Sequence, residues 1–143
     1  MIRFSPRVVL ACLLAATSAC SSPTPESPTA PSTPPAPVSS TTTLTGTVAA
    51  YGTTSHDYSP ARTGTLTATL TWTGTADLDL YVTASSCTGY PPDACALLAR
   101  STASSGQREE VTLTLRSTSS LKVWVDNFHP TMTVPYTLAV TLQ

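Results

Sequence analysis

Few residues of this 143-residue chain are of types that support catalysis. His56 and His129 are its two imidazoles, and the sequence has no Gly-x-Ser-x-Gly motif to hold a serine nucleophile on a sharp turn. His56 lies in a turn-rich stretch and His129 precedes a proline, so we predict both in solvated loops. The sequence predicts a noncatalytic protein. A hydrolase is the less favoured alternative, which a histidine beside a carboxylate in a pocket would support.

Carboxylates two residues apart are the best metal-ligand types in the chain. Asp77 and Asp79 share one face of a predicted strand, and Asp126 or Asn127 could add oxygen ligands if the fold brings that strand end close. The favoured alternative is structural, because aspartate readily hydrogen-bonds nearby backbone amides at a strand's start. We predict no required cofactor, with calcium at Asp77, Asp79 and Asp126 as the lesser alternative. Glu109-Glu110 is predicted to be a solvated strand entrance.

Two aromatic residues are the ligand-binding candidates. Tyr81 and Trp124 each lie between aliphatic residues, so alternation places both rings on the outward side of their strands. Exposed rings on a flat sheet can stack on sugar rings or pack against a protein. For Trp124 the favoured interpretation is that a loop covers the ring or that it packs between strands, and an exposed ring is the alternative. Trp72, on the apolar side of its strand, is predicted to belong to the core.

The four cysteines differ in context. Cys12 lies in an apolar run near the N-terminus and Cys20 follows that run, whereas Cys87 and Cys95 are close together in the second half of the chain. The N-terminus predicts export, as described next, and two cysteines that remain in an exported chain favour a disulfide between Cys87 and Cys95. Free thiols or a metal site are less favoured.

The N-terminus indicates export. Arg3 and Arg7 precede an apolar run over residues 8–16. This run is too short to span a bilayer, so residues 1–19 are predicted to be a signal peptide. Cys20 after two small residues resembles the lipobox of bacterial lipoproteins, which implies an acylated, palmitate-bearing Cys20 and a membrane anchor. Thr17 stands where that motif usually has Leu, and cleavage at an Ala-x-Ala-like site is the alternative. Ser21 implies the outer membrane of a cell envelope.

Composition limits the partners. Residues 20–43 are rich in Pro, Ser and Thr and bury too little apolar surface to fold, so we predict a disordered linker. The chain has a formal net charge of −1, and its cations are scattered singly. Without a basic stripe to neutralise phosphates, nucleic acid is excluded as a partner.

From residue 44 to residue 143 apolar residues alternate with Thr and other polar residues, which is typical of half-buried strands. About seven to eight short antiparallel strands, each with one apolar face, predict an all-β fold of two packed sheets, a β-sandwich. Residues 94–103 are ambiguous and could hold a helical turn. The predicted inward residues are Leu66, Ala68, Leu70, Trp72, Leu78, Leu80, Val82, Val111, Leu113, Leu115, Leu121, Val123, Val125, Tyr136, Leu138, Val140 and Leu142.

The same region resembles the bacterial pre-peptidase C-terminal domain. The resemblance is carried by Gly64–Trp72, Ala76–Val82 with its DLDLY sequence, Ala99–Thr112, Val123–Val125 and Tyr136–Val140. It implies a jelly-roll-like β-sandwich that acts as an accessory module, as in secreted hydrolases. Some members bind collagen or polysaccharide, and the collagen-binding branch uses calcium.

The sequence thus predicts a lipid-anchored, noncatalytic cell-envelope module that binds an extracellular polysaccharide or protein, or assists another envelope protein. A spacer or surface-coat lipoprotein without a ligand is the alternative. Ligand-binding assays separate the two, since uniform failure to bind favours the spacer.

Overall fold

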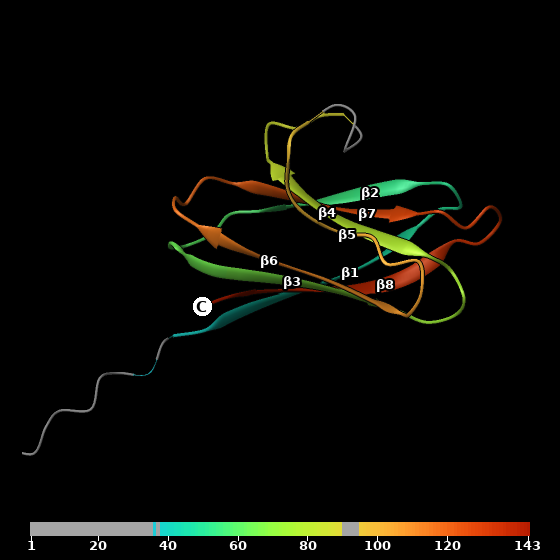
Figure 1. Ribbon diagram of the computed structural model, residues 1–143, viewed down its shortest axis with the longest axis horizontal. Helices are drawn as coiled ribbons and strands as arrows, with labels where there is room; N and C mark the ends of the chain where they lie inside the picture. The colour runs from blue at the N-terminus through green and yellow to red at the C-terminus, as the bar shows by residue number, and fades with distance from the viewer. Residues whose placement is uncertain (1–35, 37, 90–94) are drawn as a thin grey trace, which may run out of the picture. The chain divides into compact units, whose positions relative to one another are not determined.

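The computed structural model describes residue 36, residues 38–89 and residues 95–143. The predicted signal peptide and Cys20 lie outside the described residues. The described part of the chain forms eight strands and no helix (Figure 1). They are β1 (Ser40–Val48), β2 (Thr53–Tyr58), β3 (Gly64–Trp72), β4 (Leu78–Ala84), β5 (Leu97–Ser101), β6 (Arg108–Leu115), β7 (Leu121–Asn127) and β8 (Val134–Leu142).

The strands form two four-stranded antiparallel sheets stacked as two layers (Figure 1). Sheet A has the order β1-β8-β3-β6, and sheet B has the order β2-β7-β4-β5. Consecutive strands therefore repeatedly cross from one sheet to the other, which is the jelly-roll arrangement of two interlocked Greek keys. The predicted all-β, jelly-roll-like sandwich is confirmed.

The core lies between the sheets, where the period-two pattern places it. Along β3, for example, Leu66, Ala68 and Leu70 are fully buried, while the threonines between them are partly or fully exposed. Trp72 belongs to this core, as predicted, and its indole N–H donates to the carbonyl of Ala76 at 2.8 Å. Hydrophobic burial of one face of each sheet accounts for the two-layer architecture.

Three elements differ from the sequence prediction. β1 begins at Ser40, four residues earlier than the predicted domain start, because the Thr-rich segment pairs with β8 along its whole length. β2 (Thr53–Tyr58) occupies a stretch predicted to be turns and loop. β5 (Leu97–Ser101) is a strand where a helical turn was an alternative, and it pairs with β4.

Residues 38–89 and 95–143 contain no helix long and apolar enough to cross a membrane.

Candidate functional site

The outward side of sheet A is an array of threonines, which we call the threonine face. Each strand contributes the residues that alternate with its buried ones, and all of them are exposed or partly exposed. The array consists of Thr41, Thr43, Thr45, Thr47, Thr65, Thr67, Thr69, Thr71, Thr112, Thr114, Thr137 and Thr141.

Strand register aligns these threonines into rows across the sheet. One row runs Thr41, Thr141, Thr67 and Thr112, one residue from each strand. Neighbouring hydroxyls in it are hydrogen-bonded, with 2.9 Å between the Oγ1 atoms of Thr41 and Thr141 and 3.3 Å between those of Thr67 and Thr112. The rows make an ordered surface of hydroxyl and methyl groups. Strand spacing sets the repeat across the sheet at roughly 4.8 Å.

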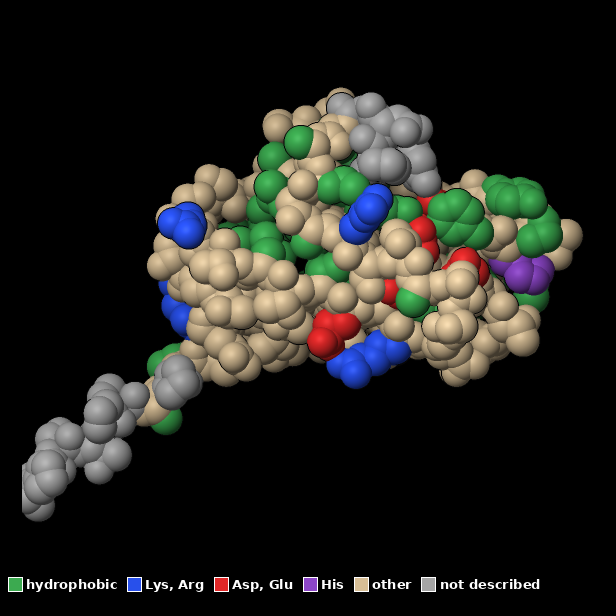
Figure 2. All heavy atoms as spheres, viewed as in Figure 1, with side chains coloured by type: hydrophobic (Ala, Val, Ile, Leu, Met, Phe, Trp, Pro, Cys, Tyr) green, Lys and Arg blue, Asp and Glu red, His purple; other side chains and the backbone are tan. Residues whose placement is uncertain are grey.

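Charge is confined to one margin of this surface. Among the outward positions of the four described strands, Arg108 and Glu110 of β6 are the charged residues, and they pair with each other. Glu110 also accepts a hydrogen bond from the Thr69 hydroxyl at 3.0 Å. In the space-filling view, basic and acidic side chains are scattered over the visible face without a basic patch (Figure 2). The rest of the threonine face is uncharged.

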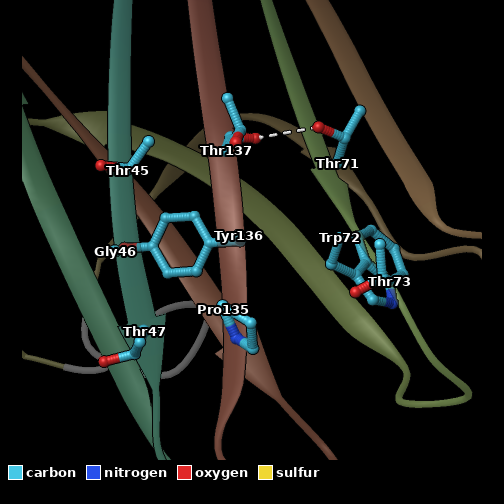
Figure 3. A pocket seen from close by; sticks show the side chains of 9 residues that line it. All are labelled: Thr45, Gly46, Thr47, Thr71, Trp72, Thr73, Pro135, Tyr136 and Thr137. Atoms are coloured by element: carbon cyan, nitrogen blue, oxygen red, sulfur yellow. Dashed lines mark hydrogen bonds between the residues drawn. The ribbon is translucent and has the colours of Figure 1, made fainter.

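A broad hollow of about 770 Å³ lies at one end of the threonine face. β1 and β8 each contribute three consecutive residues to it, the end of β3 contributes two and Thr73 follows directly, and none of these is charged (Figure 3). The lining consists of Thr45, Gly46, Thr47, Thr71, Trp72, Thr73, Pro135, Tyr136 and Thr137.

Gly46 is required where Tyr136 crosses towards β1 (Figure 3). A Cβ at position 46 would lie 2.5 Å from the Tyr136 hydroxyl, so any larger residue would displace the ring. That hydroxyl hydrogen-bonds with His56 Nε2 of sheet B at 2.7 Å, which ties the two layers together below the hollow. Burial raises the pKa of the Tyr136 hydroxyl.

The predicted aromatic binding residues face outward on sheet B, as alternation indicated, but they are covered. Tyr81 is 5% exposed and Trp124 is 8% exposed, and both pack in a small cluster with Cys87, Cys95 and Leu97. The disulfide between Cys87 and Cys95 is confirmed, and both of its residues belong to this cluster. Trp124 is therefore covered, which was the favoured interpretation, and the alternative of an exposed ring does not hold.

Polar atoms under this cover are satisfied internally. The Trp124 indole N–H donates to Thr83 Oγ1 at 2.9 Å, and the Tyr81 hydroxyl donates to Asp79 Oδ2 at 2.7 Å. Lys122 closes the margin, because its ammonium donates to the Cys87 carbonyl at 2.9 Å and lies 5.4 Å from the Trp124 ring centre. These groups form a second, smaller core.

The predicted calcium residues are brought only partly together. Asp79 and Asp126 are cross-strand neighbours on β4 and β7, and both are buried. Asp126 accepts a hydrogen bond from the Thr53 hydroxyl at 2.9 Å, in keeping with the structural alternative. In residues 38–89 and 95–143 no three His, Cys, Asp or Glu side chains are grouped as metal ligands.

Burial raises the pKa of Asp79, and the nearby charges of Asp77, Glu109 and Asp126 add to that effect. Glu109 is only 1% exposed, so the predicted solvated entrance is wrong for this residue. Its carboxylate accepts hydrogen bonds from the Ser101 hydroxyl and from the Ala103 backbone N–H, the latter at 3.0 Å. Glu109 therefore fastens the connection between β5 and β6.

The histidines do not form a catalytic pair. His56 lies on β2, half-buried between the sheets, so its prediction as a solvated loop residue is wrong; burial lowers its pKa and keeps it neutral at pH 7. His129 lies in the β7–β8 loop, where Nδ1 accepts hydrogen bonds from the backbone N–H of Thr131 and Met132 at 3.3 and 3.1 Å. The hydrogen bonds of both imidazoles organise the fold.

No protein-family model matches the chain, and no curated protein matches it in sequence. Solved structures do match its fold. The Yersinia pseudotuberculosis-derived mitogen is 20% identical with a TM-score of 0.56, covering 74% of this chain and 88% of the mitogen. The pre-peptidase C-terminal domain of collagenase from Bacillus anthracis is 14% identical with a TM-score of 0.53, covering 69% of this chain and 87% of that domain.

A third similar structure is PliG of Aeromonas hydrophila, a periplasmic inhibitor of g-type lysozyme. It is 20% identical with a TM-score of 0.51, covering 72% of this chain and 86% of the inhibitor. At these identities the likeness is one of fold. The sequence resemblance implied the fold of the pre-peptidase C-terminal domain, and the structure has a similar fold.

Proposed function

We propose that this protein is a noncatalytic binding module outside the cytoplasm, and that the threonine face binds a neutral polysaccharide. The observation that carries the proposal is the uncharged hollow lined by residues of three neighbouring strands. The module is held at the cell envelope, in the outer membrane, by acylation of Cys20. Residues 20–39 then act as its linker.

The chemistry of the hollow suits sugars better than it suits ions. A threonine hydroxyl both donates and accepts hydrogen bonds, as sugar hydroxyls do, and its methyl group offers apolar contact to the C–H face of a sugar ring. Binding a neutral chain here requires no desolvation of a charged side chain, which would be costly. Individual hydroxyl contacts contribute little net energy, so a polymer that contacts several threonines is favoured over a single sugar.

Two observations support a noncatalytic role outside the cytoplasm. The disulfide is typical of oxidising compartments. Among proteins of similar fold, one is a periplasmic lysozyme inhibitor, and another is the pre-peptidase C-terminal domain of a collagenase. The inhibitor also makes a protein ligand the second candidate, whereas the uncharged hydroxyl surface favours the polysaccharide.

The binding test is co-sedimentation with insoluble cellulose, chitin and peptidoglycan, with and without calcium. Thr71→Glu and Thr137→Glu place charge and bulk in the hollow, and we expect each to weaken binding by about tenfold or more. Ser55→Glu on the exposed edge strand of sheet B is the matched control and should bind like the wild type. Equal binding by all four proteins would move the site elsewhere. Failure of the wild type on every polymer would contradict polysaccharide binding and leave the protein ligand and the spacer as the candidates.

The anchor is tested separately. In cells expressing the full chain, Cys20→Ala should move the protein from the membrane fraction to the soluble fraction, because stable anchoring depends on the acyl chains. Retention of this variant in the membrane fraction would contradict lipid attachment at Cys20.

A further inference from the structure

Four strand edges are open to pairing in a sandwich of two four-stranded sheets. They belong to β1 and β6 in sheet A and to β2 and β5 in sheet B. An unpaired edge presents backbone N–H and C=O groups that can pair with another chain, and natural proteins protect such edges with charge, proline, bulges or short strands.

Three of the four edges carry such protection. β5 has only five residues, includes Arg100, and lies beside a register shift between Val82 and Thr83 of β4. β2 has six residues and carries Asp57, which pairs with Lys122 at 3.9 Å. β6 carries Arg108 and the neighbouring glutamates, and it packs beside β5.

β1 lacks every one of these features. It is nine residues long, its sequence STTTLTGTV contains no charge and no proline, and it pairs with β8 from Ser40 to Val48 without a register shift. Leu44 at its centre is only partly buried against the core. β1 is therefore a long, regular and uncharged edge strand, and its central Leu44 still exposes apolar surface that a partner could bury.

We propose that β1 pairs antiparallel with β1 of a second copy of this chain, which joins the two A sheets into one eight-stranded sheet. Two identical strands can pair in this way about a two-fold axis. Residues directly opposite each other in an antiparallel ladder point to the same side of the sheet, so outward residues of one copy face outward residues of the other. The threonines of both copies then meet on the outer side, and Leu44 of each copy gains cover on the inner side. The threonine rows continue from one copy into the next.

A second copy fits better than an unrelated extended peptide for two reasons. The pairing hides Leu44 in both chains at once, and it brings no charge opposite an uncharged strand. Cross-strand threonine pairs of this kind are favourable and already occur within sheet A, between Thr41 and Thr141. The proposal does not depend on what the threonine face binds.

Sedimentation velocity over a range of protein concentrations tests the pairing. We expect the wild type to form dimers as concentration rises. The double variants T43K/T45K and T43E/T45E each place like charges across the new ladder and should raise the dimer dissociation constant by about tenfold or more. An equimolar mixture of the two variants places opposite charges together and should dimerise again.

T112K/T114K is the matched control, because it makes the same substitutions at exposed outward positions of the opposite edge strand β6. This variant should dimerise like the wild type. A wild type that stays monomeric at all concentrations, or lysine and glutamate variants that dimerise as well as the wild type, would overturn the proposal. Binding of a foreign extended peptide by a monomeric wild type would assign the edge to another partner and would equally overturn it. Far-ultraviolet circular dichroism checks that all variants are folded.

Discussion

The outward sides of the two sheets differ in exposure, although both arise from the same period-two alternation. On sheet A the outward threonines remain at the surface. On sheet B the outward residues of the two central strands are mostly buried, because Leu97 and the disulfide-bonded Cys87 and Cys95 pack against Tyr81 and Trp124. The outward side of sheet A stays at the surface, whereas that of sheet B contributes to a second core.

The residue types on the two outward sides account for this difference in exposure. Threonine has high strand propensity and is stable at a half-exposed position, so a face of threonines needs no cover. An aromatic pair such as Tyr81 and Trp124 would expose a large apolar area, and covering it is favourable. Outward aromatic residues therefore indicate a covered face as readily as a binding platform, and a nearby disulfide loop favours the cover.

The largest effect that separates the two faces is expected from Trp124→Ala. Removing the indole empties the centre of the covered cluster and leaves Thr83 without its donor. We expect a loss of about 3 kcal/mol in the free energy of unfolding. Chemical denaturation followed by circular dichroism measures it. A loss below about 1 kcal/mol would mean that the cover contributes little to stability.

Opening the disulfide should have the next largest effect. The double variant Cys87→Ser/Cys95→Ser, or chemical reduction, breaks the covalent link between two residues that pack in the cluster with Trp124. Loss of the loop constraint is expected to lower the free energy of unfolding by about 2–3 kcal/mol. In NMR spectra the indole N–H of Trp124 should shift and exchange faster, while that of Trp72 in the main core stays protected. If both indoles respond alike, the cover and the main core unfold as one unit.

The matched substitution Thr→Ala compares the two faces directly. Thr83→Ala leaves the buried indole N–H of Trp124 without an acceptor and is expected to cost roughly 1–3 kcal/mol. Thr67→Ala removes a 3.3 Å hydroxyl contact at a half-exposed position and should cost at most about 0.5 kcal/mol. Equal costs for the two variants, measured by chemical denaturation, would remove the distinction between a covered and an open face.

Most of the fold could be predicted because burial follows alternation. The inward residues of β3, β4, β7 and β8 are the core that the pattern indicated, and the covalent pairing followed from two cysteines left in an exported chain. β2 escaped prediction because its sequence TTSHDY lacks aliphatic residues, so its inward positions, filled by Thr54, His56 and Tyr58, do not show a hydrophobic period.

The candidate site could be predicted only in part. Alternation along β3 already indicated a face of hydroxyls, but the rows depend on the order of the strands and their register, which bring Thr41, Thr141, Thr67 and Thr112 together from four distant segments. The burial of Tyr81 and Trp124 depends on the path of a loop, and alternation carries no information about loops. Glu109 is missed for the same reason, since its partners lie in the β5–β6 connection.

The smallest expected effect concerns the acidic residue beneath the cover of sheet B. Because the folded-state pKa of Asp79 is raised above its ordinary value of 3.8, the folded protein holds this proton more tightly than the unfolded chain does. Ionised Asp79 therefore weakens the fold at neutral pH, and its unfavourable contribution disappears as pH falls through the raised pKa towards 3.8. Asp79→Asn keeps an oxygen acceptor for the Tyr81 hydroxyl without the charge.

We accordingly expect Asp79→Asn to be slightly more stable than the wild type at pH 7 and to lose that advantage near pH 4. Thermal unfolding of both proteins across this pH range gives the difference in stability between them. Titrating groups that behave alike in the two proteins do not contribute to this difference. Asp57→Asn is the control, because Asp57 is exposed and its surface ion pair with Lys122 at 3.9 Å contributes little to stability. A variant less stable than the wild type at pH 7 would show that Asp79 contributes through its charge, and that the buried acid is a stabilising part of the second core.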